Sequence, residues 1–135
     1  MSKVIVIKSE QHGLFPEQEA ILSWNFSKVE YVNVLQDGWT LEEQKEFLYD
    51  GKFGPGGEFF DSSLCFASPI PALLGMAAAE AVRYRLLGPS HIGLRGVLVF
   101  HNDRRETKEV PDGKGGVRLI KTVSPTGWIL VDVTN

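Results

Sequence analysis

Four short runs of apolar residues recur along the first hundred positions of the chain. They occupy residues 3–7, 29–35, 63–67 and 96–101 and are dominated by valine, isoleucine and leucine. Runs of this length and composition predict β-strands. Because most of them contain few polar residues, they are typical of a sheet that is covered on both faces.

Three segments between these runs predict helices. Residues 16–25 begin with Pro16, whose fixed φ and missing N–H suit the first turn of a helix. In the second segment, Thr40 and Glu43 have the spacing of a capping box, so a helix is expected to begin just after Thr40. The third segment, residues 71–87, is rich in alanine, which favours helix.

The C-terminal part of the chain has a different pattern. Residues 106–110 and 117–121 are strand-like and flank the sequence Pro-Asp-Gly-Lys-Gly-Gly, which is a strong signal for a β-hairpin. Residues 127–133 predict a final strand. By contrast, the glycine-rich residues 52–58 predict a loop, either a lid or a simple connection.

The order of these elements predicts an α/β fold. Alternating strands and helices favour a Rossmann-like, mainly parallel sheet with helices on both faces. The last strands are expected to add antiparallel edges, with the C-terminal β-hairpin at the edge of the sheet. The chain of 135 residues suits a single domain, residues 1–135.

Composition narrows the class of protein. Hydrophobic residues make up 43% of the chain and charged residues 23%, which are ordinary values for a globular domain. No apolar run approaches the ~20 residues of a membrane-spanning helix, so no membrane association is expected. The single cysteine, Cys65, excludes an internal disulfide and favours a cytoplasmic location.

The charge is distributed unevenly. The whole chain has a formal charge of −3, but residues 95–121 hold seven basic and four acidic side chains and carry +3. Two interpretations stay open: a solvated surface hairpin, or a small anionic ligand bound at one place. Binding to duplex nucleic acid is disfavoured, because nonspecific affinity needs many phosphate contacts.

Candidate binding residues follow from the position of the strands. In open parallel sheets, ligands bind at the carboxyl ends of the strands. The first strand leads into Lys8 and Ser9, the third into Ser68, and the fourth into residues 101–105. If these loops converge, hydroxyls, free backbone N–H groups and guanidinium groups surround one crevice.

The turn Ser68-Pro69-Ile70-Pro71 precedes the alanine-rich helix. The free N–H groups and the positive dipole end of a helix favour an anion. Ser68 is therefore a candidate phosphate ligand, with Pro69 and Ile70 beside it. The alternative interpretation is that Ser68 only caps the helix.

The densest polar cluster of the chain is His101, Asn102, Asp103, Arg104 and Arg105. Arginine forks bind phosphate through two hydrogen bonds, and histidine moves protons near neutral pH. A solvated strand end with local Asp–Arg pairing would have the same sequence, so both interpretations stay open.

Two lysines of the hairpin, Lys108 and Lys121, could lie across from one another. They would then either assist a ligand site or only protect an exposed edge from aggregation.

Other families of sites fit poorly. The chain lacks GxGxxG after its first strand and lacks GxxxxGK[ST], which disfavours conventional dinucleotide and triphosphate sites. The three histidines His12, His91 and His101 have no metal-ligand spacing, so no metal and no cofactor is predicted. Cys65 lies inside an apolar run and is interpreted as a core residue.

The pattern resembles a family of small CRISPR-associated proteins with a CARF-like Rossmann core, notably the compact ring nucleases. The resemblance is carried by the strand and polar loop around Ser9 and by three later stretches: LCFASPIPALLGMAAAEA, VLVFHNDRRETKE and KEVPDGKGGVRLIKT. It covers most of the chain in the order of elements and contains no diagnostic motif.

The resemblance implies a homodimer that binds a cyclic oligoadenylate across its two-fold axis. It further implies cleavage without a metal, in which a ribose 2′-hydroxyl attacks the adjacent phosphate. Ser9 and Ser68 would then contact phosphates or position the attack, and Arg104 and Arg105 would stabilise charge. His101, Lys108 or Lys121 would assist the leaving oxygen. A nucleotide-binding sensor without catalysis would have the same sequence pattern, and so would a subunit that binds another protein through its hairpin and glycine-rich loop.

Overall fold

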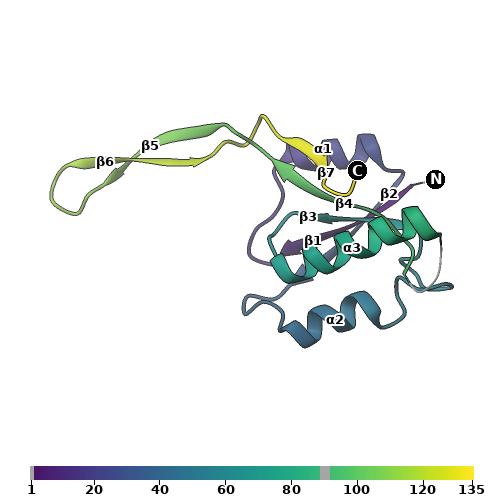
Figure 1. Cartoon of the computed structure of the whole chain (residues 1–135). Helices are drawn as coiled ribbons and strands as arrows, with labels where there is room; N and C mark the ends of the chain where they lie inside the picture. The colour runs from purple at the N-terminus through teal and green to yellow at the C-terminus, as the bar shows by residue number, and fades with distance from the viewer. Residues whose placement is uncertain (1, 89–91) are drawn as a thin grey trace.

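The computed structural model describes residues 2–88 and 92–135, and its centre is a five-stranded sheet in the order β2-β1-β3-β4-β7 (Figure 1). Its strands are β1 (Lys3–Ser9), β2 (Lys28–Val34), β3 (Ser62–Phe66), β4 (Leu94–His101) and β7 (Ile129–Asp132). The first four are parallel, and β7 is antiparallel to β4. The mostly parallel α/β sheet predicted from the sequence is therefore confirmed.

Helices cover both faces of this sheet (Figure 1). Helix α1 (Pro16–Asn25) lies on one face, and α2 (Leu41–Tyr49) and α3 (Pro71–Leu87) lie on the other. All three helices occupy the predicted segments: α1 begins at Pro16, α2 begins directly after Thr40, and α3 covers the alanine-rich residues 71–87.

Alternation along β1 creates two hydrophobic cores. Val4 and Val6 point to the α1 face and share a cluster with Leu22. Ile5 and Ile7 point to the other face and pack in the larger cluster with α2 and α3. Successive side chains of a strand face opposite sides, so a strand that is apolar throughout supplies both cores.

The β-hairpin differs from the prediction. Strands β5 (Arg105–Pro111) and β6 (Val117–Val123) form a separate two-stranded sheet and do not join an edge of the main sheet. This arm, residues 105–123, extends away from the body of the protein (Figure 1). Most of its side chains are exposed on both faces, so it has no continuous apolar face with which to pack on the body.

The glycine-rich loop is a packed connection and not a lid. Phe53 is completely buried and Phe59 nearly so, and both belong to the larger core. Their rings lie 5.5 Å apart, and each also contacts Phe47 of α2. The loop therefore contributes aromatic side chains to the core that its composition does not indicate.

The start of α2 confirms the predicted capping box. The Glu43 amide donates a hydrogen bond of 3.1 Å to the Thr40 hydroxyl, and the Thr40 amide donates one of 3.1 Å to the Glu43 carboxylate. The hydroxyl thereby pairs an N–H group that the first turn of the helix leaves free.

Thr40→Ala is expected to lower the free energy of unfolding by about 1 kcal/mol, because it removes this acceptor. Urea denaturation of both proteins measures the difference. Thr40→Ser keeps the hydroxyl and is expected to lose much less; equal losses for the two variants would contradict a capping role.

Among the described residues, no helix is both long and apolar enough to cross a membrane.

Candidate functional site

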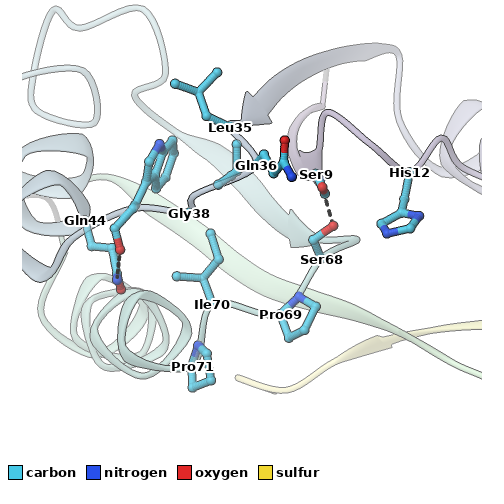
Figure 2. Close-up of a pocket in the computed structure, with 12 residues that line it drawn as sticks. Ser9, His12, Leu35, Gln36, Gly38, Gln44, Ser68, Pro69, Ile70 and Pro71 are labelled. Atoms are coloured by element: carbon cyan, nitrogen blue, oxygen red, sulfur yellow. Dashed lines mark hydrogen bonds between the residues drawn. The ribbon is translucent and has the colours of Figure 1, made fainter.

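A pocket of about 440 Å³ opens at the carboxyl ends of β1, β2 and β3 (Figure 2). Pockets for small molecules usually occupy about 300–1,000 Å³, so this one has the size for a single nucleotide-like group. Its lining residues are Ser9, His12, Val34, Leu35, Gln36, Gly38, Trp39, Gln44, Ser68, Pro69, Ile70 and Pro71. Four of the predicted site residues therefore meet here, namely Ser9, Ser68, Pro69 and Ile70.

Ser9 and Ser68 are joined directly. The Ser9 amide donates a hydrogen bond of 2.7 Å to the Ser68 hydroxyl oxygen. The Ser9 hydroxyl oxygen in turn accepts a bond of 3.3 Å from the Gln11 amide. Since a hydroxyl both accepts and donates, each of these two keeps its own hydrogen for another acceptor.

The N-terminus of α3 forms the adjoining wall. The segment before it, Ser68 to Pro71, is held to β1 because the Ser68 amide donates to the Ile7 carbonyl oxygen over 3.2 Å. The first N–H groups of a helix have no partner within the helix. Together with the helix dipole, they favour an anion beside Ser68.

The opposite wall is apolar and contains one polar group without a partner. Trp39 packs against Phe47 with ring centroids 5.0 Å apart. Gln44 is only 8% exposed, and its amide nitrogen donates to the Trp39 carbonyl oxygen over 3.1 Å. Its Oε1 has no hydrogen-bond partner. The oxygen is shielded from solvent, so a ligand could donate to it only if the Gln44 side chain turned toward the pocket. Such a bond would remove the cost of an unpaired buried acceptor.

The charge of the pocket is set by its backbone and not by its side chains. No carboxylate, ammonium or guanidinium group belongs to the described residues that line it. The lining includes one imidazole, that of His12, which lies exposed at one end of the pocket beyond Ser9 and Ser68 (Figure 2).

The cluster from His101 to Arg105 does not line this pocket, so the three predicted loops do not share one crevice. The Asn102 side chain donates to the carbonyl oxygens of Ser124 and Thr126, over 3.2 and 2.9 Å. The Arg104 amide donates to the Asn102 side-chain oxygen over 2.9 Å. These bonds tie together the two chain segments at the base of the arm.

The charged side chains around Asn102 are also used locally. The Arg105 guanidinium donates to the Asn102 carbonyl oxygen over 2.8 Å. His101 Nε2 lies 2.8 Å from an Asp103 carboxylate oxygen. Among the described residues, Asp103 pairs with His101 and not with Arg104 or Arg105, so the local Asp–Arg pairing considered from the sequence is not the one observed.

The predicted lysines lie elsewhere. Lys8 projects on the α1 face, where its ammonium group lies 5.7 Å from the centre of the Tyr31 ring. On the arm, Lys121 pairs with Thr107, and Lys108 pairs with Ile120. Because consecutive residues of a strand face opposite sides, Lys108 and Lys121 point away from each other. The expectation that Lys108 and Lys121 lie across from one another is therefore wrong, because the residue opposite Lys121 is Thr107, the neighbour of Lys108.

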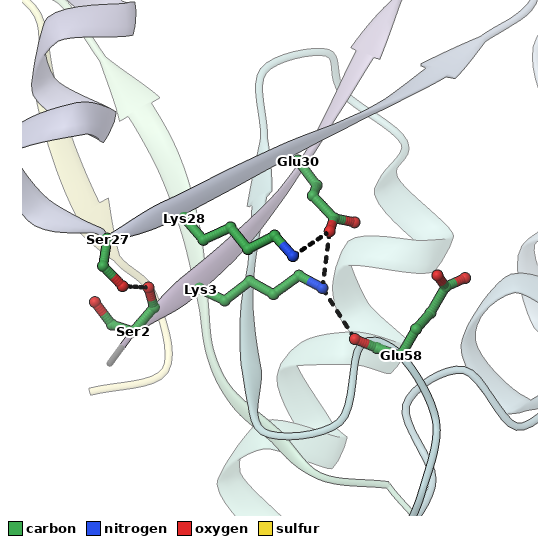
Figure 3. Close-up of polar contacts among 6 residues, drawn as sticks. All are labelled: Ser2, Lys3, Ser27, Lys28, Glu30 and Glu58. Carbon is green, nitrogen blue, oxygen red and sulfur yellow. Dashed lines mark hydrogen bonds and ion pairs between the residues drawn. The ribbon is translucent and has the colours of Figure 1, made fainter.

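A second polar cluster lies at the amino end of β1 (Figure 3). The Lys3 ammonium lies 3.0 Å from the Glu30 carboxylate and donates to the Glu58 carbonyl oxygen over 2.9 Å. The hydrogen bond from Lys3 lowers the pKa of Glu30, with a further contribution from Lys28. This cluster links β1 and β2 to the glycine-rich loop and has a structural role.

In residues 2–88 and 92–135, no three His, Cys, Asp or Glu side chains are grouped to hold a metal ion. His91, one of the three histidines considered above, lies outside the described residues. Cys65 is completely buried in the core on the α1 face, as predicted.

Eight of the twelve residues that line the pocket were not predicted as site residues, among them His12, Trp39 and Gln44. His12 lies in the loop after β1, which the rule that ligands bind at the carboxyl ends of parallel strands selects. Nothing in the spacing of His12 distinguishes it from the other residues of that loop. Trp39 and Gln44 flank the capping box of α2, and only the packing of α2 beside α3 brings them to Ser68.

Comparison of the chain with protein-family models, with curated proteins and with solved structures finds no match.

Proposed function

We propose that this pocket binds one nucleotide unit of a cyclic oligoadenylate, and that the protein is a ring nuclease that switches off type III CRISPR signalling. One observation supports it above all. Donors for a phosphate line the same pocket as Gln44, whose buried Oε1 lacks a partner and would accept from a base amino group once the side chain turns toward it. The sequence resemblance described above points to the same ligand.

Gln44 and Trp39 are the residues that favour an adenine base at one end of the pocket. Adenine carries an exocyclic amino group that donates hydrogen bonds and a flat face that is buried favourably against apolar side chains. Gln44 Oε1 is an acceptor in need of such a donor, and Trp39 and Ile70 provide the apolar surface. A guanine, which presents a carbonyl at the same position, would leave Oε1 unpaired.

Ser9, Ser68 and the start of α3 are the groups that favour a phosphate at the other end of the pocket. The two hydroxyls can each donate to a phosphate oxygen, and the helix dipole stabilises its charge. Since the pocket has room for about one nucleotide, a ring of four or six requires a second copy of the chain. A homodimer is therefore part of the proposal.

The reaction needs only groups that hold geometry and move one proton. The ribose 2′-hydroxyl oxygen bonds to phosphorus, and the bond from phosphorus to the 5′-oxygen breaks. The products are a 2′,3′-cyclic phosphate and a free 5′-oxygen, which takes up a proton from water and becomes a hydroxyl. Ser9 and Ser68 hold the phosphate in line, and His12 accepts the proton of the 2′-hydroxyl.

The test is incubation of the purified protein with cyclic tetra- and hexa-adenylate in EDTA, followed by chromatography of the products. We expect a linear product that ends in a 2′,3′-cyclic phosphate. Absence of binding to either ring would overturn the proposed function. Recovery of an intact ring from a stable complex would contradict the nuclease and favour a sensor.

Two substitutions separate binding from catalysis. Ser68→Ala is expected to weaken ring binding about tenfold, because it removes a hydrogen bond to a charged group, whereas Ser68→Thr retains it. His12→Gln is expected to slow cleavage about 100-fold and to leave the dissociation constant within about twofold. Isothermal titration and single-turnover rates measure the two quantities. Ser23→Ala, the same change at an exposed position of α1 outside the pocket, is the control.

A further inference from the structure

One face of the arm carries three exposed apolar side chains between charged and polar ones, which are Arg105, Thr107, Glu109 and Lys121. Cross-strand pairing places Val117, Leu119 and Val123 on the same face, because they pair with Pro111, Glu109 and Arg105 at alternate positions. Val117 and Leu119 are 63% and 66% exposed. An isolated two-stranded ribbon is only marginally stable in water, so this face gains stability if a partner covers it.

The arm begins at the same end of the sheet as the pocket. It continues from the carboxyl end of β4, and the pocket lies at the carboxyl ends of β1, β2 and β3. Seven residues of strand reach about 24 Å, and the arm projects away from its own body (Figure 1). A two-fold contact between the carboxyl ends of two copies would therefore lay each arm beside the other copy's pocket.

The mouth of the pocket offers a complementary surface. Leu35, which lines the pocket, is 63% exposed; Leu41, which does not line it but begins α2 two residues after the lining residue Trp39, is 52% exposed. Helix α2 carries three glutamates, Glu42, Glu43 and Glu46, against one lysine.

The charges of arm and body also match. The arm holds five basic and three acidic side chains, a formal charge of +2. The whole chain carries −3, so the rest of it carries −5. Basic residues on the arm and acidic residues on α2 would attract each other across an interface.

We propose that the arm of one copy packs across the pocket mouth of a second copy, reciprocally, with Leu119 and Val123 against Leu35 and Leu41. Lys121 lies between Leu119 and Val123 on the same face of the arm. The contact therefore brings an ammonium group to a pocket whose own lining has none among the described residues. The inference rests on the proposed function only for the ligand that Lys121 would meet.

The first test is the oligomeric state of the full chain without nucleotide, by sedimentation velocity. We expect a dimer, and we expect Leu119→Asp and Leu35→Asp each to raise its dissociation constant at least about tenfold. Trp24→Asp alters an exposed side chain on α1 and is the matched control. Circular dichroism verifies that every variant is folded. A monomeric wild type, or a dimer broken by Trp24→Asp and not by Leu119→Asp, would overturn the inference.

The second test identifies the contact itself. Leu119→Cys and Leu35→Cys are introduced into separate, differently tagged chains that also carry Cys65→Ala, and the two are mixed under oxidising conditions. We expect a disulfide between the two chains. Lys108→Cys, on the opposite face of the arm, is expected to form none with Leu35→Cys. If the predominant disulfide joins two Leu119→Cys chains to each other, the arms pair with each other and the inference is overturned.

Neither test uses a nucleotide, so the two proposals can fail separately. If the crosslink forms and no ring binds, the proposed function is wrong and the contact between copies stands. If a ring binds and the crosslink is absent, the contact is wrong and the pocket stands.

Discussion

Phe53→Ala is expected to lower the free energy of unfolding by about 3–5 kcal/mol, the usual cost of removing a buried aromatic ring from a core. Phe53 is completely buried, although it lies in a glycine-rich loop. Its ring contacts Phe47 at 5.5 Å in an edge-to-face arrangement and Phe59 at the same distance. Its removal leaves a cavity that both rings border, so the loss includes their contacts as well.

The measurement is urea denaturation monitored by circular dichroism. Phe60→Ala is the matched control, because it removes the same atoms from a half-buried ring in the turn that follows this loop. We expect its cost to be about half that of Phe53→Ala, in proportion to the area buried. If Phe60→Ala costs as much or more, Phe53 does not hold the loop in the core.

The burial of Phe53 is a feature that the local sequence pattern does not predict. The glycines and the proline correctly predict a loop, because they punctuate local structure. Whether a loop is packed or free depends on side chains that reach distant elements, and local pattern carries no information on this. The sequence therefore predicts the position of the loop and leaves a lid and a simple connection open, and the structure shows a packed connection.

The regular elements were predicted well for the opposite reason. Periodicity is a local property, and the strands and helices of the sheet follow it to within about two residues. The arm was predicted only in part. Its two strands were predicted, but their separation from the main sheet was not. Whether a hairpin joins a sheet depends on a free edge far away in the sequence, and here β7 takes the edge beside β4.

The candidate site was predicted in the same partial way. A general rule on parallel sheets selected Ser9 and Ser68, which are 59 residues apart and share a hydrogen bond of 2.7 Å. The rule failed for residues 101–105, because Asn102 bonds to the segment before β7. Such pairings between loops are decided by tertiary structure alone.

Cys65 gives the second large effect, which depends on pH. Its thiol is completely buried between Val6 and Leu98 of the neighbouring strands. Burial raises the pKa of Cys65 from 9.0 to about 12, because the thiolate would lose its hydration in this core. In the unfolded chain the thiol keeps its ordinary pKa.

The sign of the effect follows from which state loses the proton more easily. Below about pH 9 the thiol is protonated in both states, and stability is unaffected. Above this pH the unfolded state ionises first and is favoured, so stability falls until the folded state ionises near pH 12. At about pH 10.5 the expected loss is about 2 kcal/mol relative to pH ~8, rising to about 4 kcal/mol at pH ~12.

The experiment compares the wild type with Cys65→Ala by urea denaturation at about pH 8 and at about pH 10.5, on either side of the ordinary thiol pKa. Burial also raises the pKa values of Tyr31, Tyr49 and Tyr84, so both proteins are expected to lose some stability in this range. Only the difference between the two losses reports the thiol, and we expect the wild type to lose about 2 kcal/mol more. Equal losses would mean that the thiolate is solvated in the folded protein. In that case the native thiol would also react with iodoacetamide at the higher pH as fast as a free thiol, whereas a buried Cys65 reacts only when the protein unfolds.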